Sequence, residues 1–164
     1  MSVAPDSAVV LAQQEVEQAL ALDATILSLI RRWSPGLGYD GIYQDTVPPP
    51  VPPPGHPSRT ELYPAIVLAD KGTVFKYVYG DLGPTISGYE MTLGVMAVTT
   101  GRSKAVLYPL VARIKQVLHN HRVPGGTIRS MISNGEQGQV EIGDDGNPYS
   151  WLGDDWRIIG QLPA

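Results

Sequence analysis

Near the middle of the chain lies the segment Gly88-Tyr-Glu-Met-Thr-Leu-Gly-Val-Met-Ala-Val-Thr99, in which every second residue is apolar. One side of this period-two pattern is entirely apolar and consists of Tyr89, Met91, Leu93, Val95 and Ala97. Such alternation predicts a β-strand with one face against a core. Gly101 ends the segment, and the fold is therefore expected to be built around a sheet.

Further strands are expected on both sides of this segment. The stretch Thr73-Val-Phe-Lys-Tyr-Val-Tyr79 is β-branched and aromatic, as strands prefer. Asn134-Gly135 and Asp145-Gly146 are expected to be hairpin turns, because tight turns need residues that tolerate positive φ. The other expected strands are 62–69, 127–133, 137–142, 149–152 and 155–159.

Two helical regions complete the pattern. Residues 6–33 repeat apolar side chains at three- and four-residue spacing, and Asp23 is expected to cap a second, short helix within them. Arg31 and Arg32 are placed in its last turn, where the helix dipole favours cations. Residues 103–121 form an apolar stripe interrupted by Pro109, which predicts either a kink or a helix that begins near Tyr108.

The order of elements is α-β-β-β-α-β-β-β, which predicts an α+β fold with a mainly antiparallel sheet packed against two helices. A length of 164 residues suits a single domain, 1–164. It divides into a helical part (6–33), a Pro-rich loop or arm (35–60) and a sheet with the second helix (61–160). The arm is expected to be extended polyproline II at Pro48, Pro49, Pro50, Pro52, Pro53 and Pro54.

Composition excludes several functions. The chain has no cysteine, so thiol catalysis and cysteine-bound zinc are ruled out. The net charge of −4 argues against a general nucleic-acid or anionic-membrane binder. That charge is segregated into −5 over residues 1–90, +6 over 91–135 and −5 over 136–164. The segregation has two interpretations, a solvated surface or a subunit with complementary faces.

Candidate catalytic and metal sites are weak. His119 and His121 point about 200° apart on a helix, so they do not share a metal there. The loop 143–147 lacks the spacing of a calcium-binding loop and is expected to be a turn. Asp154 and Asp155 are adjacent on a strand and should face opposite sides, which is wrong for an acid/base pair. With no nucleophile motif either, the chain is expected not to be an enzyme and to need no cofactor.

Targeting and membrane segments are also not expected. The N-terminus Met1-Ser-Val-Ala-Pro-Asp6 lacks the basic region of a signal peptide. The longest apolar stretch, 19–30, is too short and too polar to span a bilayer.

Five stretches together resemble a known family. They are Ala19-Leu-Ala-Leu-Asp-Ala-Thr-Ile-Leu-Ser-Leu-Ile30, Tyr39-Asp-Gly-Ile-Tyr-Gln-Asp-Thr-Val-Pro48, Tyr63-Pro-Ala-Ile-Val-Leu68, Tyr89-Glu-Met-Thr-Leu-Gly-Val-Met-Ala-Val-Thr-Thr-Gly-Arg-Ser103 and Asp145-Gly-Asn-Pro-Tyr-Ser-Trp-Leu152. Over roughly residues 10–160 the chain resembles the tail terminator (tail completion) proteins of long-tailed bacteriophages, the group related to the lambda-type terminator. The family offers no active-site residues, and the Pro-rich stretch is longer than its pattern.

The resemblance implies a structural virion protein at the head-proximal end of the tail, assembled in the cytoplasm of the bacterial host. Its subunits would form a ring, usually a hexamer, that caps the tail tube, ends tube polymerisation and docks the head connector or stopper. DNA would pass through the lumen without sequence-specific binding, and a sheath protein is a further partner that the resemblance leaves open. No membrane is expected as a partner.

Charge then suggests sites for these contacts. An acidic lumen would let DNA slide, and the candidate lumen or interface acids are Glu136, Glu141, Asp144, Asp145, Asp154 and Asp155. The candidate basic helix facing a partner carries Lys104, Arg113, Lys115 and Arg122, and the proline arm is a candidate partner contact.

Two other interpretations stay open. Another ring of the phage neck, such as a head–tail adaptor or stopper, or a tube-like protein would share this small β-rich character. A small hydrolase or a calcium-binding module comes from a different class, and it would require His119 and His121 or the loop 143–147 to be functional.

Overall fold

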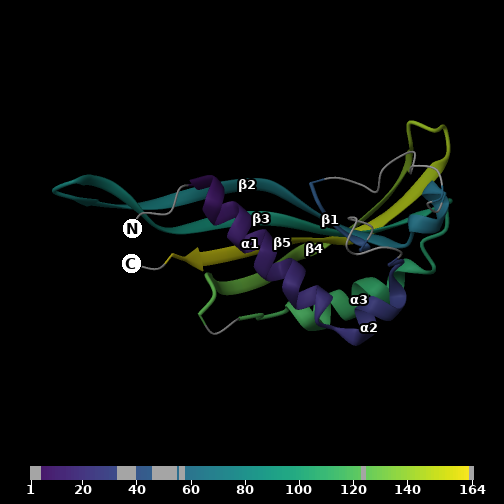
Figure 1. Cartoon of the computed structure of the whole chain (residues 1–164), viewed down its shortest axis with the longest axis horizontal. Coiled ribbons are helices and arrows are strands. Elements are labelled where there is room, and N and C mark those ends of the chain that lie inside the picture. Colours follow the sequence, from purple (N-terminus) through teal and green to yellow (C-terminus); the bar gives the residue numbers. More distant parts are fainter. Residues whose placement is uncertain (1–4, 33–39, 46–54, 56–57, 123–124, 163–164) are drawn as a thin grey trace.

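A computed structural model gives the architecture of residues 5–32, 40–45, 55, 58–122 and 125–162 (Figure 1). These residues form one five-stranded sheet in the order β1-β2-β3-β5-β4. All neighbours are antiparallel except β1 and β2, which are parallel. The strands are β1 (Ile42–Gln44), β2 (Ala65–Gly80), β3 (Gly83–Thr100), β4 (Ile128–Ile142) and β5 (Pro148–Gln161). The expected α+β fold with a mainly antiparallel sheet is confirmed.

The strands are fewer and longer than the sequence pattern predicts. The expected strands 62–69 and 73–79 are parts of one strand, β2, which begins only at Ala65 and whose register shifts between Asp70 and Thr73. Asn134-Gly135 is wrong as a hairpin turn, because it lies inside β4 at a register shift between Ser133 and Glu136. A bulge accommodates the positive φ of Gly135 without reversing the chain. Residues 149–152 and 155–159 likewise join in β5.

The turn at Asp145-Gly146 is confirmed. The Gly146 amide donates to the Gly143 carbonyl at 3.0 Å, and Gly146 has a φ of 80°. This turn links β4 to β5 and lies at the end of the sheet opposite the β2–β3 turn (Figure 1). Strand β1 was not expected from the sequence, since three residues are too few for a periodic pattern.

Three helices cover one face of the sheet among the described residues: α1 (Pro5–Ala21), α2 (Ala24–Leu29) and α3 (Leu107–Leu118). The expected helical region 6–33 is therefore interrupted, as Asp23 predicts, because its side chain accepts from the Ile26 amide and caps α2. Helix α2 ends at Leu29, so Arg31 and Arg32 lie beyond its last turn, which corrects the expectation. A short 3-10 helix, η2 (Arg59–Leu62), precedes β2.

Helix α3 begins at Leu107, which places Pro109 in the first turn, where its missing amide is not needed. This confirms the later of the two expected starts and shortens the region 103–121. The buried stripe of α3 consists of Leu107, Leu110, Val111, Ile114 and Leu118. Its spacing of three and four residues is the amphipathic pattern read from the sequence.

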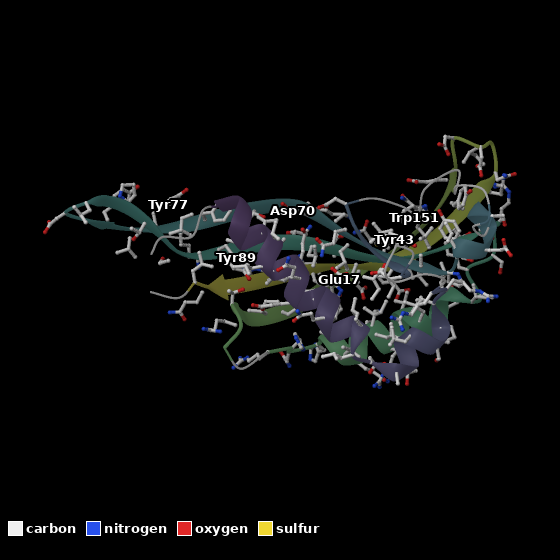
Figure 2. All side chains as sticks on the ribbon, viewed as in Figure 1. Glu17, Tyr43, Asp70, Tyr77, Tyr89 and Trp151 are labelled. Carbon is white, nitrogen blue, oxygen red and sulfur yellow. The ribbon has the colours of Figure 1, made fainter. Side chains whose placement is uncertain are left out.

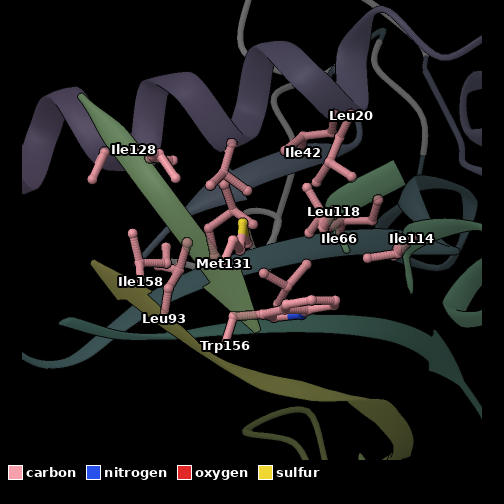
Figure 3. Packing of buried hydrophobic residues seen from close by; sticks show 14 of the residues in the cluster. Leu20, Ile42, Ile66, Leu93, Ile114, Leu118, Ile128, Met131, Trp156 and Ile158 are labelled. Atoms are coloured by element: carbon pink, nitrogen blue, oxygen red, sulfur yellow. The ribbon is translucent and has the colours of Figure 1, made fainter. Parts of the chain in front are cut away.

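The main core lies between the helices and the sheet (Figure 3). Helix α1 contributes a row at four-residue spacing, Ala8, Ala12, Val16 and Leu20, and each of these is fully buried. The sheet contributes the alternating residues of β3 together with Met131, Trp156 and Ile158. The residues Tyr89, Met91, Leu93, Val95 and Ala97 share this core, which confirms the face predicted for 88–99.

A second, smaller core lies on the other face of the sheet. It contains Tyr43, Leu62, Tyr63, Val67, Val98 and Tyr149, and Trp151 packs against it. The segment before β2 thus covers only part of this face. The remainder of the face has no helix on it in the described part of the chain.

Candidate interaction surfaces

An open trough of about 610 Å³ lies on the sheet face opposite the helices. Val67, Ala69, Met96 and Trp151 form its apolar floor, and Lys71, Gln139 and Glu141 stand at its rim. These residues come from β2, β3, β4 and β5, so the trough crosses the sheet. Figure 2 shows Trp151 near the end of the molecule that also holds the β4–β5 turn.

Two glycines leave the space of the trough open, because neither has a side chain to fill it. A Cβ on Gly153 would lie 2.2 Å from the Val95 carbonyl oxygen, and one on Gly94 would lie 3.0 Å from the Lys71 side chain. Lys71 instead reaches across Gly94 to Asp155, with Nζ and Oδ1 2.7 Å apart. The hollow is therefore built by the absence of side chains at adjacent positions.

The outer part of the β2–β3 hairpin extends past the helices (Figure 1). Its apolar side chains are exposed: Val74 at 70%, Tyr79 at 79% and Leu82 completely, with Tyr77 and Val78 about half exposed. Closer to the body, Phe75 and Ile86 pack against the main core. An apolar row thus continues from the core into solvent, and the largest exposed apolar patch of a protein is often an interaction site.

The six candidate acids lie in different places. Asp144 and Asp145 belong to the exposed β4–β5 turn, Glu141 stands at the rim of the trough, and Glu136 is exposed on β4. Asp154 and Asp155 point to opposite faces of β5, as expected for neighbours on a strand: Asp154 lies under α3, whereas Asp155 faces the trough side. Asp154 is only 1% exposed, so its burial removes it from the candidate lumen or interface acids.

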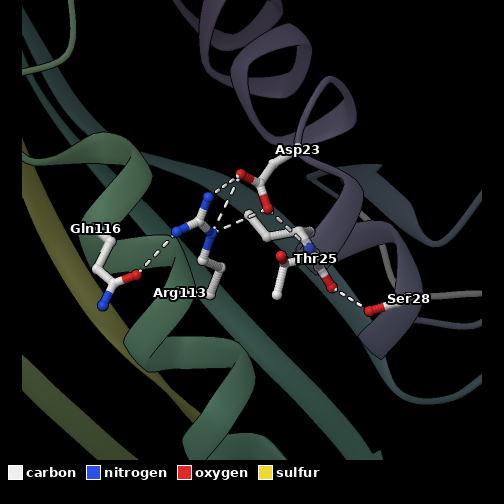
Figure 4. A network of polar contacts seen from close by, with 6 residues as sticks. Asp23, Thr25, Ser28, Arg113 and Gln116 are labelled. Atoms are coloured by element: carbon white, nitrogen blue, oxygen red, sulfur yellow. Dashed lines mark hydrogen bonds and ion pairs between the residues drawn. The ribbon is translucent and has the colours of Figure 1, made fainter.

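The four candidate bases do not share one helix face. Only Arg113 and Lys115 belong to α3, because Lys104 precedes the helix and Arg122 follows it. Arg113 is engaged within the subunit: its Nη2 donates to Oδ2 of Asp23 at 2.6 Å, and its Nε donates to the same carboxylate (Figure 4). Lys115 pairs with Glu136 and approaches Asp154 at 3.7 Å. These two residues therefore hold the helix layer together and are not available to a partner in this form.

The surroundings of Asp154 shift its ionisation. Burial raises the pKa of this carboxyl group, and the nearby Lys115 ammonium only partly opposes the effect. Neither carboxylate oxygen has a hydrogen-bond partner among the described residues. The site is a buried carboxyl group with weak compensation for its charged form, which is a feature of structure and stability.

The histidines form no metal site among the described residues. His119 caps α3 and is exposed, and His121 lies two residues beyond it. Within the described ranges, no three His, Asp or Glu side chains gather as a metal would require. The arm residues Pro48–Pro54 lie outside the described residues. None of the helices that the structure describes is long and apolar enough to cross a membrane.

Sequence reasoning missed both the trough and the exposed hairpin. The hairpin had a signal, because 73–79 is apolar on both faces of the strand, and Leu82 follows in the turn. The trough had none, since its lining residues are brought together from four strands.

No protein-family model matches the sequence, and no curated protein matches it. Among solved structures, the chain is similar to one in the virion of a native gene transfer agent particle. The TM-score is 0.57 and the sequence identity is 14%, and the match covers 95% of this chain and 98% of that chain. This is a likeness of fold that extends over almost the full length of both chains.

Proposed function

We propose that the chain is a structural subunit of a phage-like virion and that it acts as a tail terminator. In this role it forms a ring, expected to be a hexamer, on the last ring of the tail tube. The ring ends tube polymerisation and presents a docking surface for the head connector or stopper, while DNA passes through its lumen. The role is one of assembly, and no catalysis is proposed.

The observation that carries this proposal is the shared fold with a chain of the gene transfer agent virion, at 95% and 98% coverage of the two chains. The matched region takes in almost all of both chains, so the likeness concerns the fold as a whole and not one shared motif. The resemblance of the five sequence stretches to tail terminators supplies the finer assignment. The fold alone does not distinguish a terminator from its neighbours in the neck.

The surfaces of the subunit support a role in assembly. An apolar hairpin extends from the body, and an apolar trough is open on the sheet face. Glu136, Glu141, Asp144, Asp145 and Asp155 remain as acids on or near the surface. If they line the lumen, DNA is repelled by the wall and slides through it.

The decisive experiment mixes the purified protein with purified tail tube protein that is competent to polymerise. A terminator is expected to bind tube ends and to shorten the length distribution in proportion to its concentration, and electron micrographs should show a ring with a central hole. Tubes that grow to the same length at every concentration would contradict the proposal. Binding to a connector without any effect on tube length would identify a head–tail adaptor instead.

A further inference from the structure

We infer that the outer β2–β3 hairpin of one copy docks into the trough of a second copy, so that the ring is built from head-to-tail contacts. The inference rests on the ring-forming part of the proposed function. It does not depend on whether the ring caps a tube. Three observations support it: the hairpin exposes apolar side chains, the trough matches the hairpin tip in size and chemistry, and the tip and the trough lie far apart within one subunit.

The hairpin exposes more apolar surface than its own fold can cover. Val74, Tyr77, Val78, Tyr79 and Leu82 present roughly 500 Å² of side-chain surface, which is over half of the ~800 Å² that one partner contributes to a standard interface. The register pairs Tyr77 with Ile86 and Val78 with Thr85, so the exposed residues lie on both faces of the ribbon. A ribbon that is apolar on both faces fits a site that surrounds it, and a flat surface would cover only one face.

The trough matches the hairpin tip in size and chemistry. Its volume of about 610 Å³ accommodates a turn with a Leu and a Tyr side chain. The floor of Val67, Ala69, Met96 and Trp151 is apolar, and Met96 and Trp151 are half-buried in the isolated subunit. A second copy would complete the burial of these residues and of the hairpin tip in one contact.

Charges at the two surfaces are complementary. The hairpin carries Lys76 on β2 and Asp81 in the turn, and both are exposed. The rim of the trough carries Glu141 and Lys71. Because Lys71 is already paired with Asp155, the contact open to a docked hairpin is Lys76 with Glu141, which would favour one register over others.

The two surfaces cannot meet within one copy. Trp151 pairs with Val98 of β3, whereas the hairpin turn leads into Gly83, the first residue of the same strand. These positions are separated along β3 by roughly 50 Å, at about 3.3 Å per residue. Figure 2 shows Tyr77 and Trp151 toward opposite ends of the molecule. A contact between different surfaces of two copies is heterologous, and it generates a ring when the rotation closes.

The chain lacks cysteine, so paired cysteines give a direct test. Leu82→Cys places a thiol at the fully exposed hairpin tip, and Gln139→Cys places one at the rim of the trough. The double variant is oxidised at increasing concentration and analysed by non-reducing gel and by sedimentation. The matched control pairs Leu82→Cys with Leu22→Cys, because Leu22 is 86% exposed on the helix layer.

The expected result is a ladder of disulfide-linked species that ends in one closed form. Its yield should exceed that of the control pair by on the order of tenfold or more, because docking raises the effective concentration of the thiols. A mixture of the two single variants should give dimers only. Efficient linking of Leu82→Cys to itself would overturn the inference, since it would show symmetric pairing of hairpins. No ladder at any concentration would also overturn it.

The tube-length assay keeps the two proposals apart. A ladder with tubes that still grow freely would uphold the head-to-tail contact and contradict the terminator role. Capped tubes without a ladder, in a sample where both cysteines are reactive, would uphold the terminator role and contradict the head-to-tail contact.

Discussion

Asp23 joins two helices through one carboxylate. It caps α2 by accepting a hydrogen bond from the Ile26 amide at 2.9 Å. It also accepts hydrogen bonds from two nitrogens of Arg113 on α3. The sequence predicted the cap, because Asp before an apolar run is a helix-start signal. It could not predict Arg113, which lies 90 residues away. A local interaction such as a helix cap can be predicted from the sequence, whereas a contact with a residue that the fold brings close cannot.

We expect Asp23→Ala to lower the free energy of unfolding by about 1–2 kcal/mol, the usual effect of losing a cap. Asp23→Asn keeps a capping oxygen and should lose less. The Arg113 side-chain hydrogen bonds lower the pKa of Asp23, so the wild-type contribution is present above its ordinary pKa of 3.8 and is lost as the pH falls through the folded value. Urea unfolding at neutral and acidic pH measures both effects. Equal losses for Ala and Asn would show that the charge, and not the cap, dominates.

The contribution of Asp154 to stability should depend on pH in the opposite sense to that of Asp23. Burial raises its pKa, so in the folded protein the ionised form is unfavourable above that value, and the penalty disappears as the pH falls below 3.8. We therefore expect Asp154→Asn to raise the melting temperature at neutral pH, with a gain that vanishes in acid. Lys115→Ala should destabilise the protein at neutral pH, because it leaves the buried carboxylate without its cation. Destabilisation by Asp154→Asn at neutral pH would contradict this account.

At the scale of elements, α1 is attached to the sheet by a row of fully buried side chains that ends at Leu20. We expect Leu20→Ala to lower the free energy of unfolding by about 2–5 kcal/mol, because it leaves a cavity. Leu22→Ala removes the same atoms from a side chain that is 86% exposed, and it should change stability by less than about 0.5 kcal/mol. Chemical denaturation of the two variants makes the comparison. Similar losses at both positions would show that burial of Leu20 is not what attaches α1 to the sheet.

The pairing of β3 with β5 depends on a glycine opposite an aromatic residue. Gly160 pairs with Tyr89, and a Cβ at Gly160 would lie 2.1 Å from the Tyr89 ring. Tyr89 is fully buried, and its hydroxyl is hydrogen-bonded to Thr127 at 2.8 Å, so the ring has little freedom to move. We expect Gly160→Ala to destabilise by about 1–3 kcal/mol through overpacking.

The matched control is Gly80→Ala, at the end of β2, where a Cβ would meet nothing within 4 Å. It should leave the thermal unfolding midpoint nearly unchanged. A loss at Gly80 equal to that at Gly160 would point to backbone conformation as the cause instead of the Tyr89 contact.

Element types could be predicted more reliably than element lengths. The period-two pattern identified the face of β3, and the period of α3 identified its buried stripe. The joined strands were missed because Gly135 and the region 70–73 resemble turns locally. Whether such residues make a turn or a bulge depends on the neighbouring strand, and here β5 and β3 hold the chain straight. Tertiary pairing thus overrides the local signal.

At the scale of the whole molecule, the charge segregation seen in the sequence is resolved by internal pairing. Lys115 of the basic segment pairs with Glu136 and approaches Asp154, both from the acidic segment, and Arg113 pairs with the N-terminal Asp23. Part of the segregation therefore reflects contacts between elements of one subunit. The distribution of charge gives no indication of the apolar surfaces, which are the outer β2–β3 hairpin and the trough. The inference about assembly rests on these two surfaces.

These surfaces lead to a prediction that separates assembly from stability. Tyr79→Ser combined with Leu82→Ser removes two large side chains from the hairpin tip. Neither side chain belongs to the hydrophobic cores of the described residues. Exposed substitutions change stability by about 0.5 kcal/mol or less, so the melting temperature should move by only about 1–2 °C. If the tip fills the trough of a neighbour, the same change removes two interface anchors worth about 2 kcal/mol each, and subunit affinity should fall by roughly a thousandfold. Sedimentation velocity across a concentration series measures that affinity.

The control carries the same two changes elsewhere on the surface, as Tyr108→Ser with Leu22→Ser, since both side chains are exposed in the helix layer. It should assemble as the wild type does. Equal loss of assembly in the two variants would show that apolar surface in general drives association and that the hairpin has no special role. Loss confined to the hairpin variant, at an unchanged melting temperature, would mean that the extended ribbon is maintained for contact between subunits and not for the stability of the fold.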